Sequence, residues 1–290
     1  MQESLRKSVW PERAESRQTA VSVRNVSLCF GGAGTGGRTI LDKIDLDVLE
    51  GEFLCVVGAS GSGKTSLLRI LAGLLKPTEG AAYFYSEPIR GPARERAIVF
   101  QDYSKALLPW RTVKANIALG LEARKLPREA QRPIIDELLA RMGLEHASDQ
   151  YPAQLSGGMQ QRVQIARCLA QEPRILLMDE PFGALDALTR QALQDEISFL
   201  ATERKITIVF ITHDLEEAIY LGDRVVVLGG SPATVAETVK VDLPRPRHQL
   251  TTREDARFLA HRHHLFRLLA RAPSPGPGQV QSIHTLGKGK

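Results

Sequence analysis

The chain has 290 residues, of which 43% are hydrophobic and 24% charged, as is usual for a soluble globular protein. Its net charge is +5 and its pI about 9.2, but no DNA- or RNA-binding motif accompanies the positive charge, so nucleic acid is not expected as a partner. No apolar run approaches the ~18 residues that span a bilayer, no signal peptide is recognisable and the three cysteines lack metal-ligand spacing; together these features predict a cytoplasmic protein.

The N-terminal part predicts two strands after a flexible extension. Residues 1–20 are polar and charged and have little to bury. Residues 21–30 predict a strand in which apolar and polar side chains alternate with one irregularity. Residues 31–37 predict a glycine-rich turn. Residues 40–48 alternate cleanly between apolar and polar side chains, which predicts a half-buried strand.

A glycine-rich loop then joins a buried strand at 53–57 to a helix at 66–75, the context that a phosphate-binding loop requires. Its glycines let successive backbone N–H groups point at phosphate oxygens, and the helix N-terminus adds partial positive charge. We expect Lys64 to reach the β- and γ-phosphates and the Thr65 hydroxyl to ligate Mg²⁺. A glycine-rich turn that binds nothing is the alternative. The loop consists of Gly58, Ala59, Ser60, Gly61, Ser62, Gly63, Lys64 and Thr65.

Two further short strands are predicted at 81–85 and 97–100. From residue 105 to about 151 the pattern becomes helical, with an apolar face that ends at Gly143 in the manner of a helix C-cap. This segment predicts a helical insert within an α/β domain.

The segment Leu-Ser-Gly-Gly-Met-Gln-Gln-Arg at 155–162 predicts a second anion site. Ser156 is a good N-cap, and Gly157 and Gly158 leave backbone N–H groups bare at a helix start. Since the chain then has one phosphate loop and a further anion site, the second site is expected to serve a nucleotide held by another subunit.

Two carboxylates follow a buried strand at 175–178, where ligands bind in open α/β sheets. Asp179 is expected to hold Mg²⁺ through its water shell, and Glu180 to orient and deprotonate an attacking water. A surface Asp-Glu pair that begins a loop is the alternative, which the phosphate loop upstream disfavours.

The last third predicts alternating helices and strands, with a strand at 206–211, a helix at 215–221 and a strand at 224–228. This alternation implies a parallel sheet with helices on both faces. A basic, helical appendage is expected at 247–271, and a disordered tail rich in Pro, Gly and Ser at 272–290. The arginines from Arg245 onward and the histidines of the appendage are expected on a solvated face.

The phosphate loop, the segment 155–162 and the strand with two carboxylates, in this order, closely resemble the ATP-binding subunits of ABC transporters. The resemblance covers roughly 21–246. It implies an α/β fold with a RecA-like P-loop core, an antiparallel β subdomain and a helical subdomain at about 102–155. It also implies a head-to-tail dimer with a second copy, in which two ATP molecules lie between one phosphate loop and the other copy's Ser156, Gly157 and Gly158.

Other positions acquire roles only through this resemblance. Gln101 matches the glutamine that senses the γ-phosphate and metal, and Asp186 matches the loop that crosses the dimer interface. His213 matches the histidine that contacts the γ-phosphate. Phe30 is the candidate for stacking on adenine, and Ser66 extends the phosphate loop.

The stretch Leu107–Trp110, Leu-Leu-Pro-Trp, resembles importers of the nitrate, sulfonate and taurine type. It implies transmembrane permease subunits, indirectly a solute-binding protein, and a peripheral position at the cytoplasmic face of the membrane. An apolar patch here suits a groove for a short helix of a membrane subunit, or equally local core packing.

The alternatives to an importer are a soluble ABC ATPase acting on nucleic acid or ribosomes, and a phosphoryl-transfer kinase. The first usually has two cassettes or a long coiled coil, and the second leaves the segment 155–162 and His213 unexplained.

Overall fold

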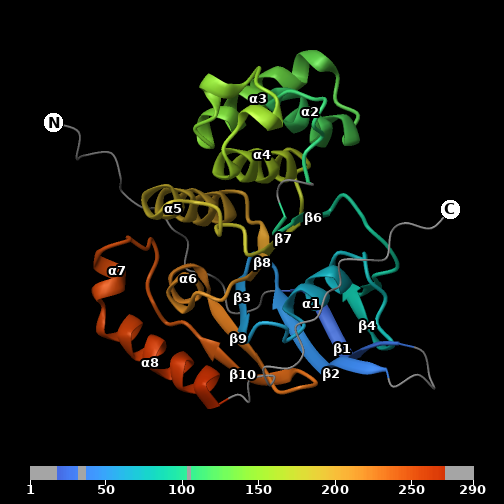
Figure 1. Cartoon of the computed structure of the whole chain (residues 1–290), viewed down its shortest axis with the longest axis vertical. Coiled ribbons are helices and arrows are strands. Elements are labelled where there is room, and N and C mark those ends of the chain that lie inside the picture. The colour runs from blue at the N-terminus through green and yellow to red at the C-terminus, as the bar shows by residue number, and fades with distance from the viewer. Residues whose placement is uncertain (1–17, 32–36, 103–105, 272–290) are drawn as a thin grey trace.

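The computed structural model describes residues 18–31, 37–102 and 106–271, and these form two sheets with helices around them (Figure 1). The expected flexible extension lies almost wholly outside the described residues, and the expected disordered tail wholly outside them. Both stay predictions. Among the described residues, no helix combines the length and the apolar character needed to span a bilayer.

The smaller sheet is antiparallel, with the strand order β2-β1-β4-β5. Its long strands bury alternate side chains, such as Ile44, Leu46 and Val48, because one face packs on the core. The predicted antiparallel part is confirmed. Its strands are β1 (Thr19–Phe30), β2 (Arg38–Leu49), β4 (Glu79–Phe84) and the short β5 (Glu87–Pro88).

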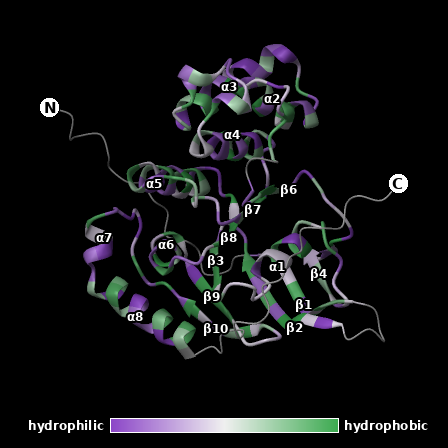
Figure 2. Ribbon diagram, viewed as in Figure 1, coloured by the Kyte–Doolittle hydropathy of each residue, from purple (hydrophilic) through white to green (hydrophobic). Residues whose placement is uncertain are grey.

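The larger sheet has the order β10-β9-β3-β8-β7-β6, in which β10 alone runs antiparallel to its neighbour. Three of its inner strands, β3, β7 and β8, are buried along their whole length, as parallel strands covered on both faces should be. Figure 2 shows these strands as a hydrophobic centre. They are β3 (Phe53–Gly58), β6 (Arg96–Val99), β7 (Ile175–Asp179), β8 (Thr207–Ile211), β9 (Arg224–Gly229) and β10 (Thr234–Lys240).

The central strand β3 contributes to both hydrophobic cores. Leu54 and Val56 belong to the core shared with the antiparallel sheet and α1 (Lys64–Leu71), while Cys55 and Val57 belong to the core that includes the other helices. The helix α1 ends four residues before its predicted end. Gly73 follows it at φ 75°, so the chain turns away in a left-handed conformation.

A helical layer lies at the top of Figure 1 and contacts the larger sheet through α4 and β6. Its members are α2 (Val113–Ala123), α3 (Arg128–Arg141), two short 3-10 helices at Glu145–Ala147 and Pro152–Gln154, and α4 (Gly157–Ala170). Because α4 packs against α2 and α3, the layer reaches past residue 155, to which the helical part was expected to extend.

The remaining helices cover the larger sheet and continue to the C-terminal part. They are α5 (Ala187–Glu203), α6 (Leu215–Leu221), α7 (Thr251–Glu254) and α8 (Ala256–Arg271). The helix α8 packs against α6 and β9, so the predicted appendage is docked rather than detached.

The expectation that the C-terminal arginines lie on a solvated face is wrong for two of them. Arg247 is only 9% exposed and donates to the carbonyls of Ile219, Tyr220 and Gly222 at the end of α6. Arg245 pairs with Asp223 at 3.0 Å. Helix ends leave carbonyls without intrahelical partners, and these two guanidinium groups supply donors there.

Two of the appendage histidines also have partners. His261 Nε2 lies 2.6 Å from Asp242 Oδ1, and His264 Nε2 lies 2.6 Å from Glu237 Oε1. Among the described residues, no group of three or more His, Cys, Asp and Glu side chains could hold a metal ion. These pairs attach α8 to the strand β10 and to the segment that follows it.

Candidate functional site

The glycine-rich loop connects β3 to α1, as predicted. Gly61 and Gly63 have φ of 77° and 80°, values that favour glycine. At Gly58 a Cβ atom would lie 2.6 Å from the carbonyl oxygen of Leu228, so the loop approaches β9 too closely for a side chain. No side chain caps α1, so the N–H groups of its first turn stay available to an anion.

Lys64 is buried inside this loop. Its Nζ atom donates to the carbonyl oxygens of Gly58 at 2.8 Å and Ala59 at 2.9 Å. Burial lowers the pKa of Lys64, while the charges of Glu180 and Asp179 raise it. Ser62 Oγ is also buried, and no hydrogen-bond partner for it exists within the part of the chain that the structure describes. A buried ammonium group, an unsatisfied hydroxyl and bare amides together fit a phosphate group.

Thr65 and Asp179 meet at the loop. Thr65 Oγ1 donates to Asp179 Oδ1 at 3.2 Å, and Asp179 is 5% exposed at the end of β7. Burial raises the pKa of Asp179, and the hydrogen bond from Thr65 lowers it. A hydroxyl and a carboxylate at this distance are the oxygen ligands that Mg²⁺ prefers.

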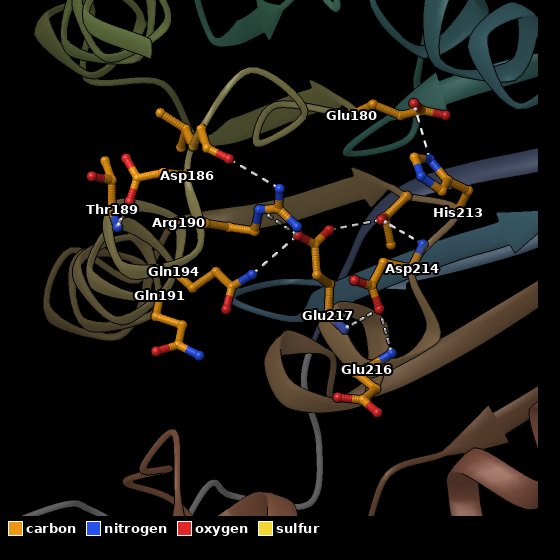
Figure 3. Close-up of polar contacts among 12 residues, drawn as sticks. Glu180, Asp186, Thr189, Arg190, Gln191, Gln194, His213, Asp214, Glu216 and Glu217 are labelled. Atoms are coloured by element: carbon orange, nitrogen blue, oxygen red, sulfur yellow. Dashed lines mark hydrogen bonds and ion pairs between the residues drawn. The ribbon is translucent and has the colours of Figure 1, made fainter.

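Two predicted residues from separate parts of the sequence converge on a carboxylate oxygen of a third, Glu180. Glu180 Oε2 accepts a hydrogen bond from Gln101 Nε2 at 3.1 Å. The same oxygen lies 3.1 Å from His213 Nδ1 (Figure 3). These residues follow β7, β6 and β8, which are adjacent parallel strands, so their carboxyl ends meet at one edge of the sheet. Glu180 has φ 45°, an unusual conformation for a residue with a side chain, and such conformations cluster at functional sites.

The second predicted anion site lies on a different part of the molecule. Ser156 caps α4 by accepting from the N–H of Met159 at 3.3 Å, and Gly157 and Gly158 form the first turn. Figure 1 shows α4 in the helical layer and α1 beside the sheets, so the fold of one chain does not bring the two anion sites together.

The segment that carries Asp186 packs against this helix start. At Gly158 a Cβ atom would lie 2.8 Å from Leu185 Cδ2, so the Leu185 side chain packs directly on the start of α4 and would have to shift for a larger residue. Asp186 caps α5 by accepting from the N–H of Thr189 at 3.0 Å, and this contact lowers the pKa of its carboxyl.

Three other predicted residues are less constrained. Phe30 is the last residue of β1 and is 51% exposed, and residues 32–36 beyond it lie outside the described residues. Ser66 is half-buried in the first turn of α1. In the Leu-Leu-Pro-Trp stretch, Leu107 lies in the core, as the core-packing interpretation expects, whereas Trp110 is 71% exposed. A contact of this stretch with a membrane subunit stays a prediction.

The predictions missed a buried polar group behind the site. Glu217 is 6% exposed in α6 and receives hydrogen bonds from Thr212 and Gln194. The only sign in the sequence is an acidic residue directly before the apolar run 218–221, and a surface glutamate gives the same pattern.

The ABC transporter family profile matches residues 41–183. The chain is 45% identical to an uncharacterized ABC transporter ATP-binding protein of Methanocaldococcus jannaschii, over 89% of this chain and 94% of that protein. It is 43% identical to the nitrate import ATP-binding protein NrtD of Synechococcus elongatus, over 77% of this chain and 82% of that protein.

The bicarbonate transport ATP-binding protein CmpC of the same species is 46% identical over 79% of this chain, but the match spans only 35% of that longer protein. Among solved structures, a dimeric ATP-binding cassette in a post-hydrolysis state, bound to ADP and Pi, has a TM-score of 0.70 and 33% identity. That match covers 76% of this chain and 98% of the other.

Proposed function

The chain belongs to the ABC transporter family as an ATP-binding subunit and is an ATPase, and from this premise we propose that it energises an importer of small oxyanions. One observation supports the assignment of the catalytic site best: Glu180 Oε2 is shared by Gln101 and His213, beside the Thr65–Asp179 contact. An acid, an amide and an imidazole around one point are the groups that can orient and deprotonate a water molecule.

We assign the phosphates of ATP to the loop at 58–65 and the first turn of α1, including Ser66. Lys64 would exchange its bonds to the carbonyls of Gly58 and Ala59 for phosphate oxygens, which accept from a buried ammonium more strongly than neutral carbonyls do. Phe30, exposed at the end of β1, would stack on the adenine ring.

Thr65, Asp179 and Gln101 would hold Mg²⁺, which when bound neutralises charge on the phosphates. Glu180 would accept the proton of the attacking water at its carboxylate. Gln101 and His213, each 3.1 Å from Glu180 Oε2, would hold this carboxylate in one orientation. The His213 side chain is 73% exposed and would itself contact the γ-phosphate.

We propose that the active form is a head-to-tail dimer. Because Ser156, Gly157 and Gly158 lie in the helical layer of their own chain, they are available to the nucleotide of a second copy. Asp186, beside the start of α4, would lie in the same interface. The solved dimer to which the chain is similar supports this assembly.

We further propose that the ATP-binding domain spans 21–246 and that 247–271 is an appendage.

The partners would be transmembrane permease subunits at the cytoplasmic face of the membrane, with a solute-binding protein acting indirectly. Exposed Trp110, close in sequence to Gln101, offers an apolar contact for a permease helix. Relatives named for nitrate and bicarbonate support an oxyanion as the solute, and we retain organosulfonates as a second class.

Replacement of the proposed base tests the catalytic assignment. Glu180→Gln keeps the shape of the side chain but removes the proton acceptor, so steady-state phosphate release should fall by roughly 10²- to 10⁴-fold. ATP binding, measured with a fluorescent analogue, should be retained. Glu129→Gln, an exposed position on α3, is the matched control and should keep the full rate. Normal hydrolysis by Glu180→Gln would remove Glu180 from this role.

The transport role is tested in the cell of origin. The tagged chain should recover a polytopic membrane protein from detergent-solubilised membranes, and that partner should change the ATPase rate. A strain lacking the chain should lose uptake of nitrate, bicarbonate or an organosulfonate, and the solute that is lost identifies the substrate. Recovery of ribosomes without any membrane protein would contradict the importer assignment.

A further inference from the structure

A buried chain of polar side chains lies behind the loops that carry His213 and Asp186. Its centre is Glu217 of α6, whose carboxylate Figure 3 shows between α5 and the loop that carries His213. Glu217 is 6% exposed, and a buried carboxylate is unfavourable unless hydrogen bonds and charges compensate for its lost hydration. Its contacts therefore indicate which parts of the molecule it holds together.

On one side Glu217 fixes the segment around His213. Thr212 Oγ1 donates to Glu217 Oε2 at 2.7 Å, and the same hydroxyl accepts from the N–H of Asp214 at 3.0 Å. Asp214 in turn caps α6 by accepting from the N–H groups of Glu216 and Glu217. Thr212 and Asp214, the two chain neighbours of His213, are thus both held against α6. Thr212 bonds directly to the Glu217 carboxylate, and Asp214 bonds to Thr212 and to the first turn of α6.

On the other side Glu217 faces α5 and the segment around Asp186. Gln194 Nε2 donates to Glu217 Oε1 at 3.1 Å, and Arg190 Nε lies 4.0 Å from the same oxygen. Arg190 Nη2 donates to the carbonyl oxygen of Leu185, the residue before Asp186, at 3.0 Å. Through Thr212 on one side and Arg190 on the other, Glu217 therefore links the His213 segment to the Asp186 segment.

The Arg190 contact is incomplete in this structure. Within the described part of the chain, its buried Nε atom has no hydrogen-bond partner, and 4.0 Å to Glu217 is an ion pair rather than a hydrogen bond. A buried unsatisfied donor next to a carboxylate is drawn toward it. A small shift of α5 toward α6 would close this contact and carry the Leu185 carbonyl with it.

We propose that Glu217 is a positioning residue that couples the His213 segment to the Asp186 segment, so that contact at the subunit interface sets the orientation of His213. This inference rests on the proposed roles of His213 at the nucleotide and Asp186 at the interface. Glu217 does not touch substrate in this scheme. A glutamate that only stabilises α6 is the competing explanation.

The ionisation of Glu217 gives a readout that packing alone would not change. Burial raises the pKa of this carboxyl, Asp214 at the start of α6 raises it further, and Thr212, Arg190 and Gln194 lower it. As the pH falls and Glu217 takes up a proton, its attraction for the Arg190 guanidinium is lost. ATPase activity should therefore decrease on the acidic side in a way that depends on Glu217.

The decisive experiment measures kcat and KM for ATP from pH 5 to 8 in wild type and Glu217→Gln. The glutamine keeps the size of the side chain but has no charge to share with Arg190. We expect kcat to fall about 10- to 100-fold at pH 7.5, since small displacements of catalytic groups have effects of this size. KM should stay within about twofold, because the phosphate loop is unchanged. The acidic decrease that depends on Glu217 should also disappear.

The matched control is Glu216→Gln on the same turn. Glu216 pairs with Arg253 and Arg262 of the appendage at 2.8 and 3.0 Å and not with α5. Its rate and pH profile should match wild type. A second variant, Thr212→Val, removes the hydroxyl that links Glu217 to the His213 segment and should lower kcat without loss of ATP binding. It provides the test if Glu217→Gln does not fold.

The outcomes separate this inference from the function on which it rests. If wild type has no ATPase activity, the proposed function fails and the coupling fails with it. If wild type is active and folded Glu217→Gln keeps both its kcat and its pH profile, the coupling alone is wrong. A lower thermal midpoint with unchanged kinetics would assign Glu217 to stability only.

Discussion

At the scale of single residues, the phosphate loop shows how local chemistry leads directly to a prediction. Loop, strand and helix are contiguous in sequence, so the roles of Lys64 and Thr65 can be predicted from the sequence alone. The burial of Glu217 cannot, because it depends on packing against α5, where its partner Gln194 lies 23 positions away in the sequence. A glutamate that faces solvent and one that faces another helix have the same local sequence.

Replacement of the buried ammonium group tests the loop. Lys64→Ala removes the cation that would contact the phosphates and leaves two loop carbonyls without their donor. ATP affinity, measured by fluorescence titration, should fall by roughly tenfold or more, in line with the loss of a charge-assisted hydrogen bond. Lys76→Ala, an exposed lysine beyond α1, is the control. Equal affinity in both variants would contradict the assignment.

At the scale of elements, the buried strands of the larger sheet were predictable because each is a short apolar run. The edge strand β10 was not, because its exposed and half-buried side chains alternate and only Val239 is buried. The order of strands in the sheet was equally out of reach. Nothing in a single sequence states that β8 lies between β3 and β7, although the ATPase fold to which the chain is similar implies such a core.

The arginines at 245 and 247 illustrate the same limit. Their charge favoured a solvated face, but the end of α6 offers carbonyls that need donors, and this tertiary demand outweighs the cost of burying a guanidinium group. Burial lowers the pKa of Arg247 to about 9, with Arg245 adding to the effect. The segment is therefore a structural connection between α6 and the appendage.

Loss of this connection should destabilise the chain. Arg247→Met fills similar volume but leaves the carbonyls of Ile219, Tyr220 and Gly222 without this donor. Unfolding free energy, measured by urea denaturation, should fall by about 2–4 kcal/mol. Arg267→Met, an exposed position on α8, should change it by less than about 0.5 kcal/mol. Similar values for both variants would show that the buried contacts contribute little.

At the scale of the whole molecule, the two predicted anion sites lie on separate layers, and only a second copy can combine them in the proposed scheme. The order of the motifs in the sequence led to the expectation of a head-to-tail dimer only through the resemblance to the family. The packing of Gly158 against Leu185 adds a physical reason, because the helix start and the Asp186 segment form one surface.

The dimer can be trapped and measured. Glu180→Gln should hold ATP without turnover, so its mass by light scattering should double when ATP and Mg²⁺ are present. Adding Ser156→Arg places a large cation at the start of α4 and should keep the protein monomeric under the same conditions. The binding of ATP analogue to each subunit should be unaffected. A dimer that persists with Ser156→Arg would place the interface elsewhere.

The central position of β3 has a consequence for how the protein is made. Its neighbours β8 and β9 are formed by residues 207–229, about 150 positions further along the chain. In the nascent chain, β3 and the phosphate loop that follows it are therefore made long before either strand that pairs with β3. Contacts between distant segments form slowly, so nucleotide should be captured only after the last third has left the ribosome. Chains truncated before residue 207 should then bind chaperones and should fail to bind ATP.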